Sequence, residues 1–431
     1  MKFLLIFFIT FSAFSQGLKD CGKRVYLPKP NWGKQFLSTP VLDQGTSGLC
    51  YAFTATQMLD YWRETNTPKL KRGRLSLSPP LYAGYLDRLY NFNVLNKGDA
   101  SKLDFGMNSL DWQLDGGMIQ VTLLAIKKYG MCRPEIFDVG LKELGKKLGL
   151  SKFDVFFIIQ SLWMKRISYF ANFNSPYGDK VRDSQGTFFE FVKLLQEKKS
   201  GGGQTSGPPG LRRRSPRLNF KEVTSVLVVN KENWSYSCKS GKKYIHECEV
   251  FTSFFDEMVS ALKETNFNFR NPKGNPFITF LGKFFKACDD PRNQYFYSKK
   301  IPNPVYINYE TKPWGPFNKP WQARYNQIVD FLNNKNAQPV GIGYCANVIT
   351  NKNYRYKPKD YRCERHASVI LGKRKRNGKC EFFLRNTWGN TCDKIPWECS
   401  SNPKYPQGHG YWVDGEALAR NLQELVYLRP R

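Results

Sequence analysis

The sequence is poor in histidine and lacks long apolar runs beyond its N-terminus. Its 431 residues include three histidines, His246, His366 and His409. This leaves no room for a histidine-rich metal site, and a reaction that needs an imidazole must use one of these three. After residue 14, no stretch approaches the roughly 18 apolar residues that cross a bilayer. We therefore expect no histidine-rich metal site and no membrane span after the N-terminal segment. The thiol chemistry inferred below needs neither a metal nor an organic cofactor.

Acidic residues are also scarce. The chain has 36 Asp and Glu against 66 Lys and Arg, a formal net charge of +30. Such a charge favours anionic partners, including nucleic acid, an anionic cell envelope or acidic protein surfaces, although solubility alone also accounts for it. The hydrophobic share of 41% and charged share of 24% are those of a globular protein. They exclude wholesale disorder and collagen-like repetition.

The N-terminus has the pattern of a cleaved signal peptide over residues 1–15. Lys2 precedes an apolar run over residues 3–14, and Ala13-Phe14-Ser15 fits the small-x-small rule of a cleavage site. We therefore expect a secreted or periplasmic protein, where disulfides form. The 11 cysteines are odd in number, so at least one thiol is left over. Cys238 and Cys248 flank a basic turn and are placed for a local disulfide.

The two ends of the chain differ in texture. Helical spacing of apolar residues predicts helices over 50–64 and over 118–129, the latter ending at Gly130. Residues 200–217 are rich in Gly and Pro, then basic, and read as a flexible loop. Short apolar runs follow at 339–348, 367–371, 381–384 and 411–413, and Asn377-Gly378 predicts a hairpin. The pattern indicates an α+β protein with a helical N-terminal part and an antiparallel C-terminal sheet.

One set of residues suits nucleophilic catalysis by a thiol. Cys50 stands where a glycine-containing loop enters a helix, and a helix N-terminus lowers the pKa of a thiol. His366 begins an apolar strand and is the candidate base, and Asn386 follows the next strand as a group to orient the imidazole. Trp388 is placed to cover that pair. The Gln44 amide and the Cys50 backbone N–H are candidate oxyanion donors.

These residues carry a resemblance to the papain-like cysteine proteases. The segment Gln44-Gly45-Thr46-Ser47-Gly48-Leu49-Cys50 resembles the family's active-site segment, His366-Ala367 its histidine segment, and Asn386-Thr387-Trp388-Gly389 its Asn-Ser-Trp-Gly. Weaker similarities come from Leu77-Ser78-Pro79, Asp115-Gly116-Gly117, Pro339-Val340 and Gly410-Tyr411. They occur in the family's order over roughly 25–136 and 320–415.

The resemblance implies a papain-like fold of two lobes and a set of roles. Cys50 is implied as nucleophile, His366 as base and then acid, Asn386 as orienter and Gln44 as oxyanion donor. Gly116 and Gly117 are implied to line the cleft and pair with an extended substrate. The implied organisation is a helical lobe over 16–136, a largely helical insertion over 137–320, and a β-rich lobe with an antiparallel half-barrel over 321–431. We expect a monomer that takes protein or peptide substrates.

The sequence departs from the family in three places. The second cysteine that the family often carries is Ser47 here, and its usual partner position is Leu114. His366 follows Cys50 by 316 residues, against roughly 130–150 in the family. An insertion of about 170–185 residues is therefore predicted within 137–320. Too few residues precede Cys50 for the usual inhibitory propeptide, so the insertion is a candidate lid or regulatory module.

Two other functions remain open at this point. One is a catalytically idle papain fold that uses its cleft for binding. The other is an amidase or transpeptidase that uses the same cysteine on cell-wall peptides, to which the positive charge is suited. The intact set of Gln44, Cys50, His366 and Asn386 favours a secreted endopeptidase that forms a thioester on Cys50.

Overall fold

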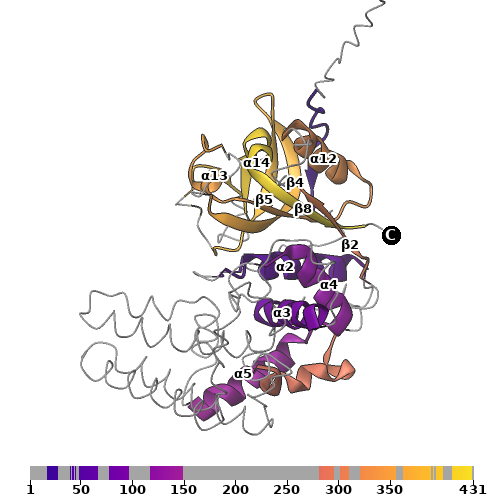
Figure 1. Ribbon diagram of the computed structural model, residues 1–431. Helices are drawn as coiled ribbons and strands as arrows, with labels where there is room; N and C mark the ends of the chain where they lie inside the picture. The colour runs from indigo at the N-terminus through magenta and orange to yellow at the C-terminus, as the bar shows by residue number, and fades with distance from the viewer. Residues whose placement is uncertain are drawn as a thin grey trace, which may run out of the picture.

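The structure is a computed structural model, and it describes residues 17–27, 39, 41–42, 44, 48–66, 77–96, 117–148, 281–295, 301–309, 321–355, 363–389, 392, 395–400 and 410–429. The predicted signal peptide, the 200–217 loop and the Cys238–Cys248 pair lie outside these residues. The described part combines helices with an antiparallel sheet, as the sequence predicts for an α+β protein. The two layers lie one above the other (Figure 1).

The upper layer is a sheet whose described strands all pair antiparallel. Its order is β2-β8-β3-β4-β5-β7-β6, and β1 pairs with β4. The strands are β1 (Val25–Tyr26), β2 (Pro304–Asn308), β3 (Val340–Cys345), β4 (Arg365–Arg376), β5 (Lys379–Arg385), β6 (Glu398–Cys399), β7 (Tyr411–Asp414) and β8 (Leu422–Leu428). The central strand β3 is buried throughout, because helices cover both faces of the sheet.

The β4–β5 hairpin confirms the turn predicted at Asn377-Gly378. Both residues have positive φ, 49° for Asn377 and 75° for Gly378. A type I′ turn requires this at its two central positions, where Asn and Gly are tolerated best. The turn sets the register that pairs Val369 with Arg385. It thereby places the start of β4 near the end of β5, where His366 and Asn386 lie.

The lower layer consists of helices. These are α2 (Cys50–Asn66), α3 (Pro80–Asn96), α4 (Ile119–Tyr129) and α5 (Pro134–Leu148). The helices expected over 50–64 and 118–129 are confirmed as α2 and α4, and Gly130 is the C-cap of α4 with φ of 88°. Every residue of α2 from Tyr51 to Glu64 is buried, because this helix lies between the sheet and the helices α3 and α4.

Two short helices and one longer one complete the sheet layer. They are α12 (Trp321–Asn333), α13 (Asn347–Thr350) and α14 (Gly415–Asn421). Both α12 and α14 lie on the face of the sheet that points away from α2 (Figure 1). Two 3-10 turns, η3 (Lys286–Asp289) and η4 (Pro291–Asn293), pack beside α5 at the other end of the molecule.

The predicted insertion leaves and rejoins the helical layer at one place. A disulfide joins Cys132 to Cys288. Beside it, the Arg133 N–H donates to the Asn293 carbonyl at 3.0 Å, and the Tyr295 N–H donates to the Met131 carbonyl at 2.9 Å. Residues 131–133 and 288–295 thus lie side by side, and the range of 137–320 for the insertion stays a prediction.

Two segments belong to the sheet that the sequence analysis placed elsewhere. Strand β2 falls inside the range assigned to the insertion, yet it pairs with β8 along its whole length. The segment 17–27 falls inside the range assigned to the helical lobe, yet β1 pairs with β4 and the Cys21–Cys380 disulfide ties it to β5. Lys19 adds an ion pair to Asp330 of α12 at 2.6 Å. The β-rich lobe thus begins before residue 321 and includes the N-terminal segment.

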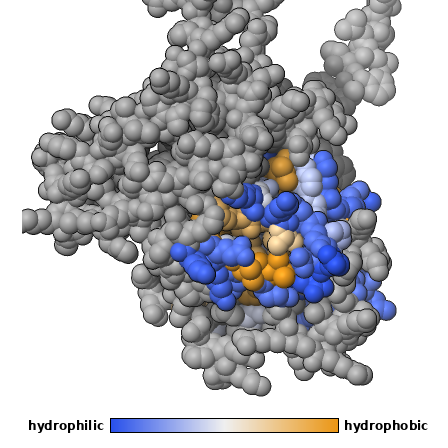
Figure 2. Space-filling view, turned by 90° about the horizontal axis from the view of Figure 1, so that it is seen from below, coloured by the Kyte–Doolittle hydropathy of each residue, from blue (hydrophilic) through white to orange (hydrophobic). Residues whose placement is uncertain are grey.

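The end of the molecule remote from the sheet carries an apolar area surrounded by hydrophilic side chains (Figure 2). Helix α5 lies at this end, and its Val139 side chain is 46% exposed. No helix among the described residues has the length and apolar character needed to cross a membrane. Four disulfides lie in the described part, including Cys345–Cys363 and Cys392–Cys399.

Candidate active site

Cys50 is the first residue of α2. Of the nine cysteines in the described part of the chain, eight form disulfides and Cys50 keeps its thiol. The Ala52 and Phe53 N–H groups both donate to the Leu49 carbonyl, so the helix begins directly at the cysteine. The positive end of the helix dipole stabilises a thiolate at this position. Cys50 is half-buried, so part of the residue is exposed to solvent.

His366 and Asn386 are joined by a hydrogen bond. The His366 Nε2 lies 2.5 Å from the Asn386 Oδ1. Because an amide oxygen only accepts, Nε2 carries the hydrogen, and Nδ1 is the ring nitrogen left to exchange a proton. Both residues are buried, His366 near the start of β4 and Asn386 directly after β5. The β4–β5 hairpin is therefore the element that brings these two predicted site residues together.

Trp388 covers the imidazole. The ring centroids of His366 and Trp388 are 4.5 Å apart. Burial lowers the pKa of His366 to about 4, and the hydrogen bond that His366 donates to Asn386 opposes part of this shift. The ring is therefore neutral at neutral pH unless a neighbouring negative charge stabilises the imidazolium.

Cys50 and His366 border the same tyrosine. Tyr344 lies opposite His366 in the β3–β4 register, and the two ring centroids are 5.8 Å apart. Burial raises the pKa of Tyr344, and the charge of Cys50 adds to this shift. Helix α2, which Cys50 begins, packs on β4, the strand of His366. Cys50 and His366 are therefore both neighbours of Tyr344, where the helical layer packs on the sheet.

A further hydrogen bond reaches Asn386 from a residue that the sequence analysis missed. The Ser368 hydroxyl donates to the Asn386 Oδ1 at 2.9 Å, and the Tyr344 hydroxyl lies 3.0 Å from the Ser368 oxygen. Ser368 follows His366 by two residues in β4 and so lies on the same face of the strand. That spacing is a signal in the sequence, but the contact with Asn386 depends on the register of β5.

Gln44 is hydrogen-bonded to Thr387, the residue that follows Asn386. Its backbone N–H donates to the Thr387 carbonyl at 2.7 Å, and its side-chain oxygen accepts a hydrogen bond from the Thr387 hydroxyl. Because the oxygen end of the amide faces Thr387, the NH₂ end is the one oriented elsewhere. This orientation suits the predicted role of Gln44 as an oxyanion donor, a role that stays a prediction.

The loop that carries Gln44 has two more attachments to the sheet. The Gly389 N–H donates to the Leu42 carbonyl at 3.2 Å. The buried Arg385 guanidinium donates to the carbonyl and the hydroxyl of Thr39, each at 3.0 Å. The segment before Cys50 and the segment around Asn386 are therefore bonded to each other at several points, although they are more than 300 residues apart in sequence.

Of the two glycines expected in the substrate cleft, one is described. Gly117 lies directly against Tyr51, so that a Cβ built there would be 2.4 Å from a ring carbon. Tyr51 follows Cys50 directly in the chain, so Gly117 is close to the predicted nucleophile. Gly116 lies outside the described residues, as do His246 and His409. Within the described ranges, no group of three or more metal-binding side chains comes together.

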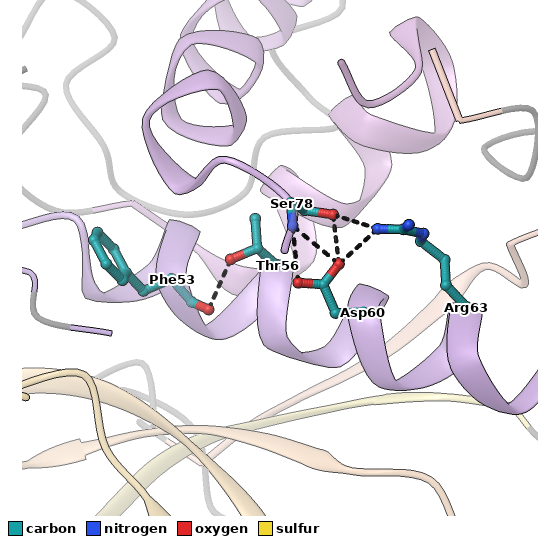
Figure 3. Close-up of polar contacts among 5 residues, drawn as sticks. All are labelled: Phe53, Thr56, Asp60, Arg63 and Ser78. Atoms are coloured by element: carbon teal, nitrogen blue, oxygen red, sulfur yellow. Dashed lines mark hydrogen bonds and ion pairs between the residues drawn. The ribbon is translucent and has the colours of Figure 1, made fainter. Parts of the chain in front are cut away.

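A buried polar cluster fixes α2 from the other side. The Asp60 carboxylate accepts from the Ser78 hydroxyl at 2.6 Å and from Arg63 at 2.9 Å (Figure 3). Arg63 also stacks on Tyr295, its guanidinium carbon 3.3 Å from the ring centroid. Burial raises the pKa of Asp60, while Arg63 and Ser78 oppose that shift. The cluster joins α2 to the start of α3 and to the segment that returns from the insertion.

No protein-family model matches this sequence, and no curated protein matches it either. Among solved structures, the digestive procathepsin L 3 of Tenebrio molitor larval midgut superposes with a TM-score of 0.34 and 11% identity. The match covers 95% of this chain and 70% of that one. A superposition this loose carries no argument about function, which must come from the site itself.

Proposed function

We propose that this chain is a papain-like cysteine endopeptidase that acts in an exported, disulfide-forming compartment. Cys50 attacks the scissile carbonyl, and its proton passes to His366 Nδ1. The resulting imidazolium then protonates the leaving amine as the thioester forms, and water attacks the thioester with the imidazole again acting as base. Gln44 and the Cys50 backbone N–H stabilise the oxyanion of each tetrahedral intermediate.

The observation that carries the proposal is the buried His366–Asn386 hydrogen bond of 2.5 Å, in a sheet on which α2, the helix that Cys50 begins, packs. Asn386 fixes the tautomer, Trp388 shields the pair from water, and Thr387 directs the Gln44 amide. A fold that only binds ligands has no physical need for a thiol, a tautomer-fixing amide and an oriented amide donor around one imidazole.

The test is intact-mass measurement after incubation with an epoxysuccinyl inhibitor of papain-like enzymes. We expect one adduct on the wild-type chain and none on Cys50→Ala. Hydrolysis of denatured protein and of isolated cell-wall peptides then separates an endopeptidase from an amidase or transpeptidase. A folded wild-type chain that gains no adduct and cleaves neither substrate would contradict the proposal. Cleavage of the wall peptides alone would replace it with the amidase function.

A further inference from the structure

A second pocket lies on the sheet lobe, apart from the residues of the candidate active site. It has a volume of about 830 Å³ and is bounded by the β4–β5 turn, the segment before β6, the start of α14 and the segment after α13. Four basic and four acidic side chains line it, together with Trp397, Ile395 and Pro396. The balance of charge in this pocket depends on which side chains neutralise one another.

The acidic residues of the pocket all have cationic partners. Arg374, which is outside the lining, binds Glu381 at 2.6 Å and Glu398 at 2.9 Å. Arg420, also outside it, binds Glu416 at 2.8 Å. Asp414 caps the helix α14 by accepting from the Ala417 N–H at 2.9 Å and lies 3.8 Å from the Lys379 ammonium. Glu398 also pairs with Arg376. The four carboxylates are thus all paired, and two of the lining cations, Arg376 and Lys379, are neutralised by them.

Two cations in the lining lack such a partner. No carboxylate in the described part of the chain pairs with Lys352 or with Arg355, and both side chains are exposed. Arg355 donates to two backbone carbonyls, those of Lys352 and Tyr354, each at 2.9 Å. The Lys352 ammonium lies 5.0 Å from the centroid of the Trp397 ring. The pocket therefore has a net positive charge on the side formed by residues 352–355.

Trp397 gives the pocket a rigid apolar surface beside those cations. Its indole N–H donates to the Val348 carbonyl at 3.1 Å, which fixes the ring. Ile395 and Pro396 extend the apolar surface. A ligand that fits this lining has one or two carboxylates near an apolar side chain. A nucleic acid strand fits less well, because its regularly spaced phosphates would approach Asp414 and Glu416.

We propose that this pocket binds an acidic peptide segment, with carboxylates at Lys352 and Arg355 and an apolar side chain on Trp397. The chain's net charge of +30 raises the encounter rate with acidic proteins. If the chain is the protease proposed above, the pocket is a second binding site, outside the active site, for substrates with acidic segments. The binding itself does not depend on catalysis, so it is testable in a chain without the nucleophile.

The test uses the full mature chain with Cys50→Ala and a rhodamine-labelled peptide, Gly-Gly-Glu-Leu-Glu-Gly, followed by fluorescence anisotropy. We expect Lys352→Gln combined with Arg355→Gln to raise the Kd about tenfold, since two ionic contacts are lost. The matched control is Lys142→Gln with Lys146→Gln, which removes the same charge from exposed positions on α5. We expect this control to leave the Kd within about twofold.

Further measurements test which chemical groups of the ligand are recognised. The peptide with Gln in place of Glu should bind at least tenfold more weakly, and Trp397→Leu should weaken the Leu peptide but not its Gly analogue. Equal binding of the Gln peptide, or equal weakening by the control pair, would overturn the proposal. So would tighter binding of a single-stranded oligonucleotide that is lost with Lys352→Gln and Arg355→Gln, which would assign the pocket to nucleic acid.

Discussion

Ser368 donates a hydrogen bond of 2.9 Å to the side-chain oxygen of Asn386, the same oxygen that accepts from His366. Asn386 is thereby held with its oxygen toward the imidazole and cannot rotate to present its NH₂ group there. Two strands contribute to this arrangement, since Ser368 lies in β4 and Asn386 follows β5. The orientation of His366, the proposed base, thus depends on a residue that need not touch a substrate.

We predict that Ser368→Ala lowers kcat about three- to tenfold and leaves KM unchanged, because Asn386 gains freedom to rotate. The free energy of unfolding should fall by about 1–2 kcal/mol, since the buried Tyr344 hydroxyl loses its partner. Tyr344→Phe supplies the matched control. In a double-mutant cycle, adding Tyr344→Phe to Ser368→Ala should recover part of the lost stability. Strictly additive losses would show that the two hydroxyls do not act together.

The second prediction concerns the stability of the folded chain in acid. The pKa of His366 falls from 6.5 to about 4 on folding. Between these values the unfolded chain binds more protons, so the stabilisation is complete above about pH 6.5 and is lost as the pH falls toward 4. In a Cys50→Ala chain, the loss attributable to His366 should total about 3 kcal/mol.

The measurement is urea unfolding from pH 4 to 7 of Cys50→Ala with and without His366→Gln. Burial raises the pKa of Asp87 to about 6, so this residue makes the folded chain less stable as the pH rises. Both chains contain Asp87, so its contribution cancels when their free energies of unfolding are subtracted. The wild-type chain should lose less stability than Cys50→Ala, since a thiolate favours the imidazolium. Identical curves for all three chains would mean that His366 is not neutral in the folded Cys50→Ala protein.

Thr387 offers a test of the role of Gln44. Thr387→Val keeps the shape of the side chain but removes the hydroxyl that binds the Gln44 oxygen. We expect kcat to fall by about tenfold or more, because the oxyanion donor loses its orientation. Alkylation of Cys50 by an epoxysuccinyl inhibitor should change little, since opening an epoxide forms no oxyanion at a carbonyl. Thr387→Ser should retain the activity, because it keeps the hydroxyl. If Thr387→Val slowed alkylation and turnover equally, the substitution would have disturbed the fold of the site rather than the orientation of Gln44.

Gly117 offers a test of how tightly the residues around Cys50 are packed. The Cβ of Gly117→Ala would lie 2.4–2.7 Å from three carbons of the buried Tyr51 ring. The ring must move, at a cost of about 1–3 kcal/mol in the free energy of unfolding, and Cys50 beside it should react more slowly with the inhibitor. Gly17→Ala is the control, because nothing lies within 4 Å of that position. Equal thermal stability of the two variants would show that Tyr51 has room to shift.

The helices and the hairpin were predictable because their signals are local. The start of α2 at Cys50, the Gly130 cap and the Asn377-Gly378 turn all follow from neighbouring residues. Strand β2 was missed because it is a five-residue edge strand that begins with a proline and follows a long insertion. The contact of Thr387 with Gln44 could not be predicted from the sequence either, since it joins residues 343 positions apart.

The cluster around Asp60 provides the final prediction, on what holds α2 in place. Arg63→Met alone leaves the buried Asp60 carboxylate without its cation, and the free energy of unfolding should fall by about 3–5 kcal/mol. Asp60→Leu alone leaves the buried Arg63 guanidinium without its carboxylate, and the free energy of unfolding should fall by a similar amount. The double variant replaces both charges with apolar groups, so it should be less destabilised than the sum of the single variants. Urea unfolding of the four chains gives the coupling energy. Because Ser78 and Tyr295 also contact the pair, the double variant should still be less stable than the wild type; additive losses would mean that Asp60 and Arg63 act independently.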